Sequence, residues 1–524
     1  MIELRGATKE YDGVVAVAGV SFIAEPGTVT GFIGPNGSGK STTLRMVAGL
    51  ERPTSGSVTI DGVAYRDHRN PAAEIGVMLD ADWLAPRRSA ADHLRWLAAG
   101  IGVPRGRADE ALALVGLQHV ADRPAAEYSL GMRQRLAVAG ALLGDPAVIV
   151  LDEPVNGLDP EAIAWTRVVL RRFAAEGRTV LVSSHLLAEL ERTADHIVLI
   201  DRGRIVADEP LADLLDRHAA PVAAGPPGGL HRRTERGPVT LEDVYFTLTE
   251  QDPDGGITGP AAPDGALAPD PRPRPRFVRA VLAELLKART TPALRALSVA
   301  VTVVTLGAAV LVGVFGAGIG HPTVDTALYG FGLLGGALTA AAGALLHTAD
   351  HDAGTVWLTR LVFPRPALTY AAKALVAAVV ALVGVAVLTT AAIGLAILAS
   401  HNADPTAAVS APGAEIARLA WTVPVVAVLL ALAGLAVGTA LRTSAAAVTA
   451  VLGWWYVAES VVVPAIPDVG RTIAAWLPVT DAEYAMIGVR VGEITWSPVA
   501  AIGIVAVWTA VLTALALWRL RIRA

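Results

Sequence analysis

Residues 31–42, GFIGPNGSGKST, carry the residue types that hold phosphate groups. From Gly34 to Ser41 they match a glycine-rich phosphate loop, in which a glycine and four further residues precede Gly-Lys-Ser. Glycines let the backbone turn so that its N–H groups point at phosphate oxygens. The Lys40 ammonium would reach the β- and γ-phosphates, and the Ser41 hydroxyl would bind Mg²⁺. The predicted nucleotide contacts are Gly34, Asn36, Gly37, Ser38, Gly39, Lys40, Ser41 and Thr42.

Two acids end a hydrophobic run further along the chain, VIVLDEP at residues 148–154. Asp152, at the carboxyl end of a predicted strand, can hold Mg²⁺, and Glu153 can orient or deprotonate an attacking water. Taken alone, the pair is equally consistent with a solvated acidic turn. Together with the phosphate loop, it predicts hydrolysis of a bound nucleotide.

An α/β domain is expected to position these residues, because residues 1–250 alternate short β-rich runs with helical patterns. Buried strands are predicted at VTGFIG, AVIVLDEP, TVLVSS and HIVLID. The phosphate loop follows the first of these and opens a helix, which is the context that the motif requires. Two Pro- and Gly-rich segments are predicted to be flexible, residues 219–238 as an insertion and residues 251–276 as a linker.

The second half of the chain has the composition of a membrane domain. The whole chain is 53% hydrophobic, and its mean hydropathy of +0.50 exceeds that of an ordinary soluble enzyme. Long apolar runs predict an all-α domain of six spanning helices within residues 277–524. Their expected bounds are 294–317, 324–347, 367–399, 415–441, 444–464 and 498–518, and the third is long enough to tilt or break. The absence of cysteine excludes disulfides, cysteine zinc sites and thiol nucleophiles.

Lysine and arginine placement predicts the orientation of this domain. Basic residues concentrate before the first span, in the second and fourth connections and at the C-terminal end, which places both ends and the α/β domain in the cytoplasm. The N-terminal residues show no basic-then-apolar signal layout. A net charge of −5 says little about partners, and no nucleic-acid partner is expected.

Residues 1–250 resemble the nucleotide-binding domain of an ATP-binding cassette (ABC) transporter. The sequence VNGLDP, with Asp159, resembles the D-loop of the family, and His185 in SSHLLAELE stands where the family has its switch histidine. Tyr11 in KEYDG resembles the aromatic residue that stacks on adenine, and LEDVYFTLT resembles a segment that often ends these domains. The resemblance implies that ATP and Mg²⁺ bind here, with Glu153 and His185 as the catalytic residues.

The family's signature loop, usually Leu-Ser-Gly-Gly-Gln, corresponds to Tyr128-Ser129-Leu130-Gly131-Met132. In the family this loop holds the γ-phosphate of the ATP bound to the opposite subunit, through its serine and the helix N-terminus. Ser129 and Gly131 match the pattern, whereas Leu130 replaces a glycine. The Leu130 side chain would either restrict close approach of the nucleotide or pack under the loop with no nucleotide role.

A second departure lies in AAEIGVMLDADWLAPRRSAADHL, which resembles the Q-loop region with Asp80 in place of the usual glutamine. A glutamine at that position touches Mg²⁺ in the family. Asp80 would then be a Mg²⁺ ligand with a charged hard oxygen, or it is simply a loop residue.

The membrane half resembles the ABC-2 type permeases, which have six spans and mostly export. Residues 347–375 match them best, and the resemblance implies a coupling helix that docks on the nucleotide-binding domain. Its candidate contacts are Gly354, Thr355, Trp357 and Arg360; the alternative is an ordinary cytoplasmic loop with basic residues. Glu459, inside the fifth predicted span, is either a functional buried acid or a residue that reaches the outer interface.

These resemblances imply an ATP-driven exporter in the bacterial cytoplasmic membrane. One chain supplies half of each ATP site, so a dimer, most simply of two identical chains, is expected to carry twelve spans and two shared sites. The expected partners are ATP, the lipid bilayer, a second copy and a small hydrophobic or peptide-like cargo. The alternative is a membrane ATPase that signals to, or activates, an extracytoplasmic partner without transport.

Overall fold

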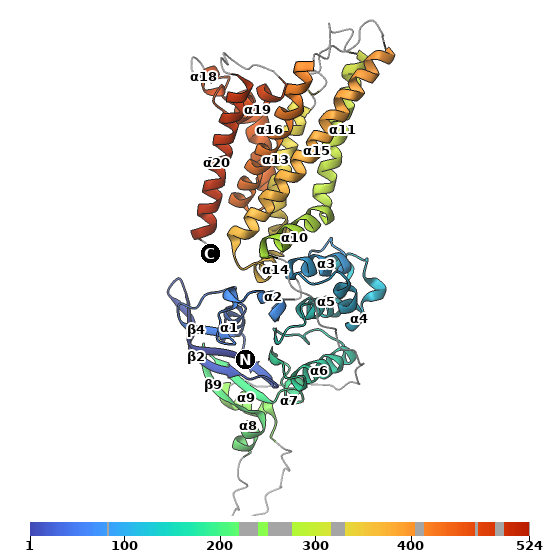
Figure 1. Cartoon of the computed structure of the whole chain (residues 1–524). Coiled ribbons are helices and arrows are strands. Elements are labelled where there is room, and N and C mark those ends of the chain that lie inside the picture. The colour runs from blue at the N-terminus through green and yellow to red at the C-terminus, as the bar shows by residue number, and fades with distance from the viewer. Residues whose placement is uncertain are drawn as a thin grey trace, which may run out of the picture. The chain divides into compact units, whose positions relative to one another are not determined.

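The computed structural model describes residues 1–80, 83–219, 239–249, 275–315, 328, 331–403, 413–466, 470–487 and 497–522. Contacts divide the chain into two units (Figure 1). The first unit is Met1–Arg279 with Trp357–Pro364, and the second unit is Ala280–Val356 with Arg365–Ala524. The predicted insertion at 219–238 lies outside the described residues except for residue 219, and the predicted linker at 251–276 except for residues 275 and 276.

A six-stranded sheet forms the centre of the first unit, in the order β5-β6-β7-β3-β8-β9. The strands from β5 to β8 run parallel, and β9 is antiparallel to β8. Strands β3, β6 and β7 are buried along their whole length, as expected of parallel strands covered on both faces. The bounds are β3 Val29–Ile33, β5 Ile75–Met78, β6 Val148–Leu151, β7 Thr179–Ser183, β8 His196–Asp201 and β9 Arg204–Pro210.

A second, antiparallel sheet has the order β2-β1-β4, with β1 at Ile2–Tyr11, β2 at Val14–Ala24 and β4 at Ser55–Ile60. Its inward side chains join the same hydrophobic cluster as those of the parallel sheet. Phe22 of β2 stacks on Phe32 of β3 with ring centroids 5.4 Å apart. The two sheets therefore share one core.

The helices of the first unit surround the sheets, and several begin at residues that favour helix starts. Ser89, Ser129 and Asp159 each accept a hydrogen bond from a backbone N–H three residues later, which caps the helix. The bounds are α1 Lys40–Val47, α2 Pro71–Glu74, α3 Ala90–Ile101, α4 Gly106–Leu114, α5 Leu130–Leu142, α6 Pro160–Ala175, α7 Leu187–Glu191, α8 Leu211–His218 and α9 Leu241–Thr249. Single 3-10 turns lie at Tyr65–Asp67, Gln118–Val120 and Ala125–Glu127.

The described part of the second unit is helical. Two helices, α10 Arg276–Thr290 and α14 Val356–Val362, carry residues of both units. The others are α11 Pro292–Phe315, α13 Gly336–Asp352, α15 Pro366–Ala403, α16 Gly413–Leu441, α17 Ser444–Gly453, α18 Gly470–Ala474, α19 Pro478–Ile487 and α20 Pro498–Ile522. Phe331–Gly335 and Trp454–Val462 are π-helical. This confirms the expected fold class of an α/β domain followed by a helical region.

Five helices among the described residues are long and apolar enough to cross a membrane, which indicates a membrane-associated protein. They are Pro292–Val312, Pro366–Ala399, Gly413–Leu441, Ser444–Val462 and Pro498–Leu520. Of the six predicted spans, the second, 324–347, lies partly outside the described residues and stays a prediction. Among the described residues there, the π-helical segment Phe331–Gly335 continues into α13, which ends in polar residues up to Asp352. The long third span is one continuous helix of 38 residues.

Glycines let α13 and α16 approach closely. A Cβ on Gly434 would lie 1.8 Å from the Ala340 carbonyl oxygen, and one on Gly343 would lie 1.9 Å from that of Ala431. Small residues at helix interfaces are typical of membrane bundles, where close backbone contact replaces the hydrophobic effect. This helix pair therefore forms a central contact of the second unit.

A charge tetrad of Glu284, Lys287, Asp350 and Lys373 is buried where α10, α13 and α15 meet in the second unit. Each side chain is at most 7% exposed. The Lys287 ammonium lies 2.9 Å from a Glu284 oxygen and 2.8 Å from an Asp350 oxygen. Lys373 lies 2.8 Å from Glu284 and 2.9 Å from Asp350. Two acids and two lysines thus neutralise one another.

Glu459 is buried in the π-helical segment Trp454–Val462, at 1% exposure. Its carboxylate accepts hydrogen bonds from Trp454 Nε1 at 2.8 Å and from the backbone N–H of Thr480 at 2.6 Å. These contacts satisfy the acid inside the helical unit, so it does not extend to the surface.

Candidate functional site

The phosphate loop connects β3, which ends at Ile33, to α1, which begins at Lys40. Two of its glycines have no room for a side chain. A Cβ on Gly34 would lie 2.1 Å from the Ile200 carbonyl oxygen, and Gly39 combines a φ of +103° with a Cβ position 2.7 Å from the Ala16 carbonyl oxygen. The loop can therefore keep its backbone N–H groups close to a ligand only with glycine at these positions.

Lys40 is folded back into the loop. Its ammonium donates hydrogen bonds to the carbonyl oxygens of Gly34 and, at 3.0 Å, Pro35. Burial lowers the pKa of Lys40, and the carboxylates of Glu153 and Asp152 offset part of this effect. A cation among these carbonyl oxygens is suited to bind an anionic group placed in the loop.

Ser41 and Asp152 come together although 111 residues separate them, with the Ser41 hydroxyl 3.3 Å from Asp152 Oδ2. Burial raises the pKa of Asp152, and hydrogen bonds from the Ser183 and Ser41 hydroxyls lower it in part. Among the described residues, no group of three or more His, Cys, Asp or Glu side chains gathers as a metal site. A hydroxyl and a carboxylate nevertheless fit Mg²⁺, which usually takes few protein oxygens and completes its octahedron with water and phosphate.

Glu153 faces His185 across the carboxyl ends of β6 and β7. Its carboxylate lies 2.6 Å from His185 Nδ1 and accepts a hydrogen bond from the His185 backbone N–H at 3.2 Å. The two side chains are 26% and 52% exposed, so water can reach both. A solvated carboxylate held by a histidine has the geometry of a base that acts on water.

Ser129, Gly131 and Asp159 lie at two helix starts that contact each other. Ser129 caps α5 by accepting a hydrogen bond from the Met132 N–H at 3.2 Å, and Asp159 caps α6. Leu130 is 43% exposed, and its side chain lies against Gly157, where an added Cβ would meet Leu130 Cδ2 at 2.3 Å. Among the described residues, no hydrogen bond or ion pair joins Ser129 or Asp159 to the phosphate loop.

Tyr11 ends β1 on the surface of the first unit. Its ring is 39% exposed, and the Lys9 ammonium lies 5.0 Å from the ring centroid. An exposed ring of this kind is available for stacking.

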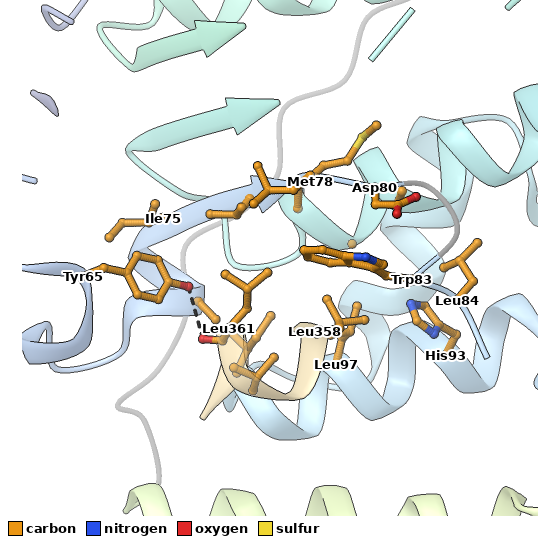
Figure 2. Close-up of a pocket in the computed structure, with 18 residues that line it drawn as sticks. Tyr65, Ile75, Met78, Asp80, Trp83, Leu84, His93, Leu97, Leu358 and Leu361 are labelled. Atoms are coloured by element: carbon orange, nitrogen blue, oxygen red, sulfur yellow. Dashed lines mark hydrogen bonds between the residues drawn. The ribbon is translucent and has the colours of Figure 1, made fainter. Parts of the chain in front are cut away.

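Asp80 follows β5 and borders a groove that is otherwise mainly apolar (Figure 2). The groove has a residual cavity of about 50 Å³ and is lined by Tyr65, Ile75, Met78, Trp83, His93 and Leu97 together with Leu358 and Leu361 of α14. Asp80 and two residues of α14 thus line the same groove. Its role toward Mg²⁺ stays a prediction.

Helix α14 docks in this groove of the first unit through Trp357–Pro364. Trp357 stacks on Trp83 with ring centroids 6.4 Å apart, and the Tyr65 hydroxyl donates a hydrogen bond to the Leu361 carbonyl oxygen at 3.2 Å. Val362 and Phe363 pack on Gly100 of α3. Of the four predicted docking residues, Trp357 and Arg360 belong to the first unit.

For Gly354 and Thr355, docking on the nucleotide-binding domain stays a prediction. Both belong to the second unit, where Thr355 is buried beside Asp350. The apolar run Leu361-Val362-Phe363 is the docking element that sequence reasoning missed, and its hydrophobicity next to charged neighbours was the available signal.

The first residues of α10 also belong to the first unit. Arg279 is 4% exposed, and its guanidinium donates to Asn70 Oδ1 and to the Ile101 carbonyl oxygen, both at 2.5 Å. Arg276 donates to the carbonyl oxygens of His68 and, at 2.8 Å, Arg69. The start of α10, up to Arg279, is therefore a second segment held by the first unit.

Comparison with known proteins gives consistent matches. The ABC transporter family model matches residues 17–156. The chain is 38% identical over 216 residues to YhcH of Bacillus subtilis, an uncharacterised ABC transporter ATP-binding protein, covering 41% of this chain and 71% of that one. It is 36% identical over 221 residues to the bacitracin transport ATP-binding protein BcrA of Bacillus licheniformis, covering 42% and 72%.

A third relative is the lantibiotic transport ATP-binding protein SrtF of Streptococcus pyogenes, 35% identical over 209 residues, which are 40% of this chain and 90% of that one. Among solved structures, an ATP-binding subunit of an ABC transporter has a TM-score of 0.41 at 26% identity and covers 47% of this chain and 98% of its own. The matches cover between 71% and 90% of the length of these three relatives. The chain therefore belongs to the ABC transporter family and carries an ATP-binding, ATP-hydrolysing cassette in its N-terminal region.

Proposed function

We propose that this chain is an ATP-driven exporter of the bacterial cytoplasmic membrane and works as a dimer with two shared ATP sites. The observation that carries the proposal is the docking of α14 in the groove of the first unit. This helix lies in the chain between α13 and the apolar helix α15, so the cassette holds a segment that continues directly into the helical half. A relative named for Nod factor export supports an outward direction, and two others are named for bacitracin transport and lantibiotic transport.

The proposed organisation is a cassette at 1–250 with an insertion at 219–238, a linker at 251–276 and an ABC-2 type membrane domain at 277–524. Both chain ends and the cassette face the cytoplasm. The five apolar helices are compatible with this organisation, as is the basic character of the segments before the first span. The proposed cargo is a small hydrophobic or peptide-like molecule.

At the ATP site, each residue has a proposed task that its geometry supports. The phosphate loop and Lys40 bind the phosphates, and Tyr11 stacks on the adenine. Ser41 and Asp152, with their oxygens 3.3 Å apart, would hold Mg²⁺, for which Asp80 is a further candidate. Mg²⁺, when bound, neutralises charge on the transferred phosphoryl group.

Glu153 orients and deprotonates the attacking water, and His185, 2.6 Å from its carboxylate, holds it in place and contacts the γ-phosphate. Ser129 and Gly131, with Asp159 beside them, complete the site of the second copy. Binding of ATP then closes the two cassettes, and hydrolysis reopens them. Helix α14 passes this movement to the helical half.

ATP hydrolysis by the purified chain in lipid vesicles tests the proposal, with Glu153→Gln as the comparison and a panel of hydrophobic drugs and cationic peptides as candidate cargo. We expect hydrolysis that requires Glu153 and rises with one class of compound. Hydrolysis that ignores every compound, together with no movement of compound across the vesicle wall, would contradict export. It would favour a membrane ATPase that signals to an extracytoplasmic partner.

A further inference from the structure

Glu153 has a backbone conformation that its surroundings must maintain. Its φ of +51° lies in the left-handed region, which residues other than glycine rarely adopt. Such a conformation persists only where neighbouring groups fix it, and it often occurs at functional sites. From this backbone turn, the Glu153 carboxylate reaches His185 Nδ1 at 2.6 Å.

Two buried side chains hold the two backbone groups of Glu153. Its N–H donates to the Ser183 hydroxyl at 2.9 Å, and its carbonyl oxygen accepts a hydrogen bond from Gln134 Nε2 at 2.7 Å. Ser183 is fully buried, and Gln134 is 5% exposed. Ser183 comes from β7, next to the site, whereas Gln134 comes from a different element, helix α5.

Helix α5 begins at the Ser129 loop, and its first two turns rest on the segment that follows Glu153. Gln134 lies five residues after Ser129. In the same stretch, Leu130 packs on Gly157, and the Arg135 guanidinium lies 4.0 Å from Asp159. Three successive contacts therefore join residues 130–135 to residues 153–159 within one chain.

We infer that Gln134 is a positioning residue for ATP hydrolysis, which fixes the backbone of Glu153 and links it to the helix that carries Ser129. The inference rests on the proposed function, in which Glu153 serves this chain's own ATP and Ser129 serves the ATP of the second copy. Through Gln134, engagement of the Ser129 loop by one nucleotide stabilises the base of the other site. Gln134 itself does not contact the reacting atoms.

Gln134→Met in the full chain, reconstituted in lipid nanodiscs, tests this role. Methionine keeps a long unbranched side chain but cannot donate a hydrogen bond. A misplaced base slows the chemical step by about 10- to 100-fold, so we expect kcat to fall by that factor. The KM for ATP and the affinity for a fluorescent ATP analogue should stay within about twofold of the values for the unmodified chain, because Gln134 does not contact the nucleotide.

Two further variants separate positioning from folding. Gln118→Met is the matched control, since Gln118 is exposed on a 3-10 turn of the same unit, and it should leave kcat unchanged. Gln134→Glu also removes the donor and should lower kcat to a similar degree. Because both residues act on one step, Gln134→Met should lower kcat no further when Glu153→Gln is already present.

The possible results are distinguishable. Full kcat in both Gln134 variants would overturn the inference, and so would a parallel loss of kcat, nucleotide binding and unfolding temperature, which indicates a structural role alone. If Glu153→Gln itself hydrolyses ATP at the normal rate, the assignment of Glu153 in the proposed function is wrong. A loss of kcat alone in Gln134→Met, with Glu153→Gln inactive, supports both.

Discussion

Substitution of Leu361 by alanine should loosen the docking of α14. The Leu361 side chain is 3% exposed and lines the groove together with Tyr65 and Leu97. Loss of three buried carbons removes about 2.4 kcal/mol at about 0.8 kcal/mol per methylene, and the remaining cavity adds a further term. A total of about 3 kcal/mol raises the equilibrium constant between undocked and docked α14 by about 100-fold.

Hydrogen exchange of the backbone amides measures this shift, because local opening exposes the N–H groups of α14. In the full chain, the peptide covering residues 357–364 should exchange about 100-fold faster in Leu361→Ala. Tyr65→Phe, which removes only the hydrogen bond to the Leu361 carbonyl oxygen, should accelerate it by about 5-fold, or about 1 kcal/mol.

Leu375→Ala is the control, since it makes the same chemical change at a side chain that is 40% exposed. It should leave exchange of residues 357–364 unchanged. Equal exchange in Leu361→Ala and the unmodified chain would refute the reasoning, because α14 would then not depend on the groove for its order.

Three further results are expected. Burial lowers the pKa of His93 to about 3, so near pH 6.5 only the unfolded chain takes up a proton on His93. The free energy of unfolding should therefore fall by about 1.4 kcal/mol for each pH unit below pH 6.5. Denaturant unfolding of His93→Gln should not show this pH dependence. Gly157 has a φ of +68°, and a Cβ there would clash with the Leu130 side chain. Gly157→Ala should therefore lower the free energy of unfolding by about 1–2 kcal/mol through the backbone alone. In a double-mutant cycle, Leu130→Ala should relieve the additional clash. Asp350→Asn leaves the lysines of the tetrad without one of their acids and should destabilise the helical unit by about 3–5 kcal/mol. Addition of Lys287→Met should restore part of this stability, measured by unfolding in detergent. Equal stability of Asp350→Asn and the unmodified chain would contradict a stabilising role of the tetrad.

The sequence determined the local features of this protein. The phosphate loop from Gly34 to Ser41, the acids after β6 and the alternation of strands and helices are all patterns of neighbouring residues. Five of the predicted spans were also evident, because a long apolar run is sufficient to identify a spanning helix. The second predicted span, 324–347, stays a prediction, because part of it lies outside the described residues.

Only the tertiary structure decided which distant residues meet. The contact of Gln134 with Glu153, the groove that receives Leu361 and the pairing of Lys287 with Asp350 each join residues far apart in the chain. Nothing in a local pattern distinguishes a buried, paired lysine from a solvated one, or a glutamine that holds a backbone carbonyl from one on a helix surface. These contacts arise because several elements bury the same side chains together, and burial is a property of the folded chain rather than of any one segment.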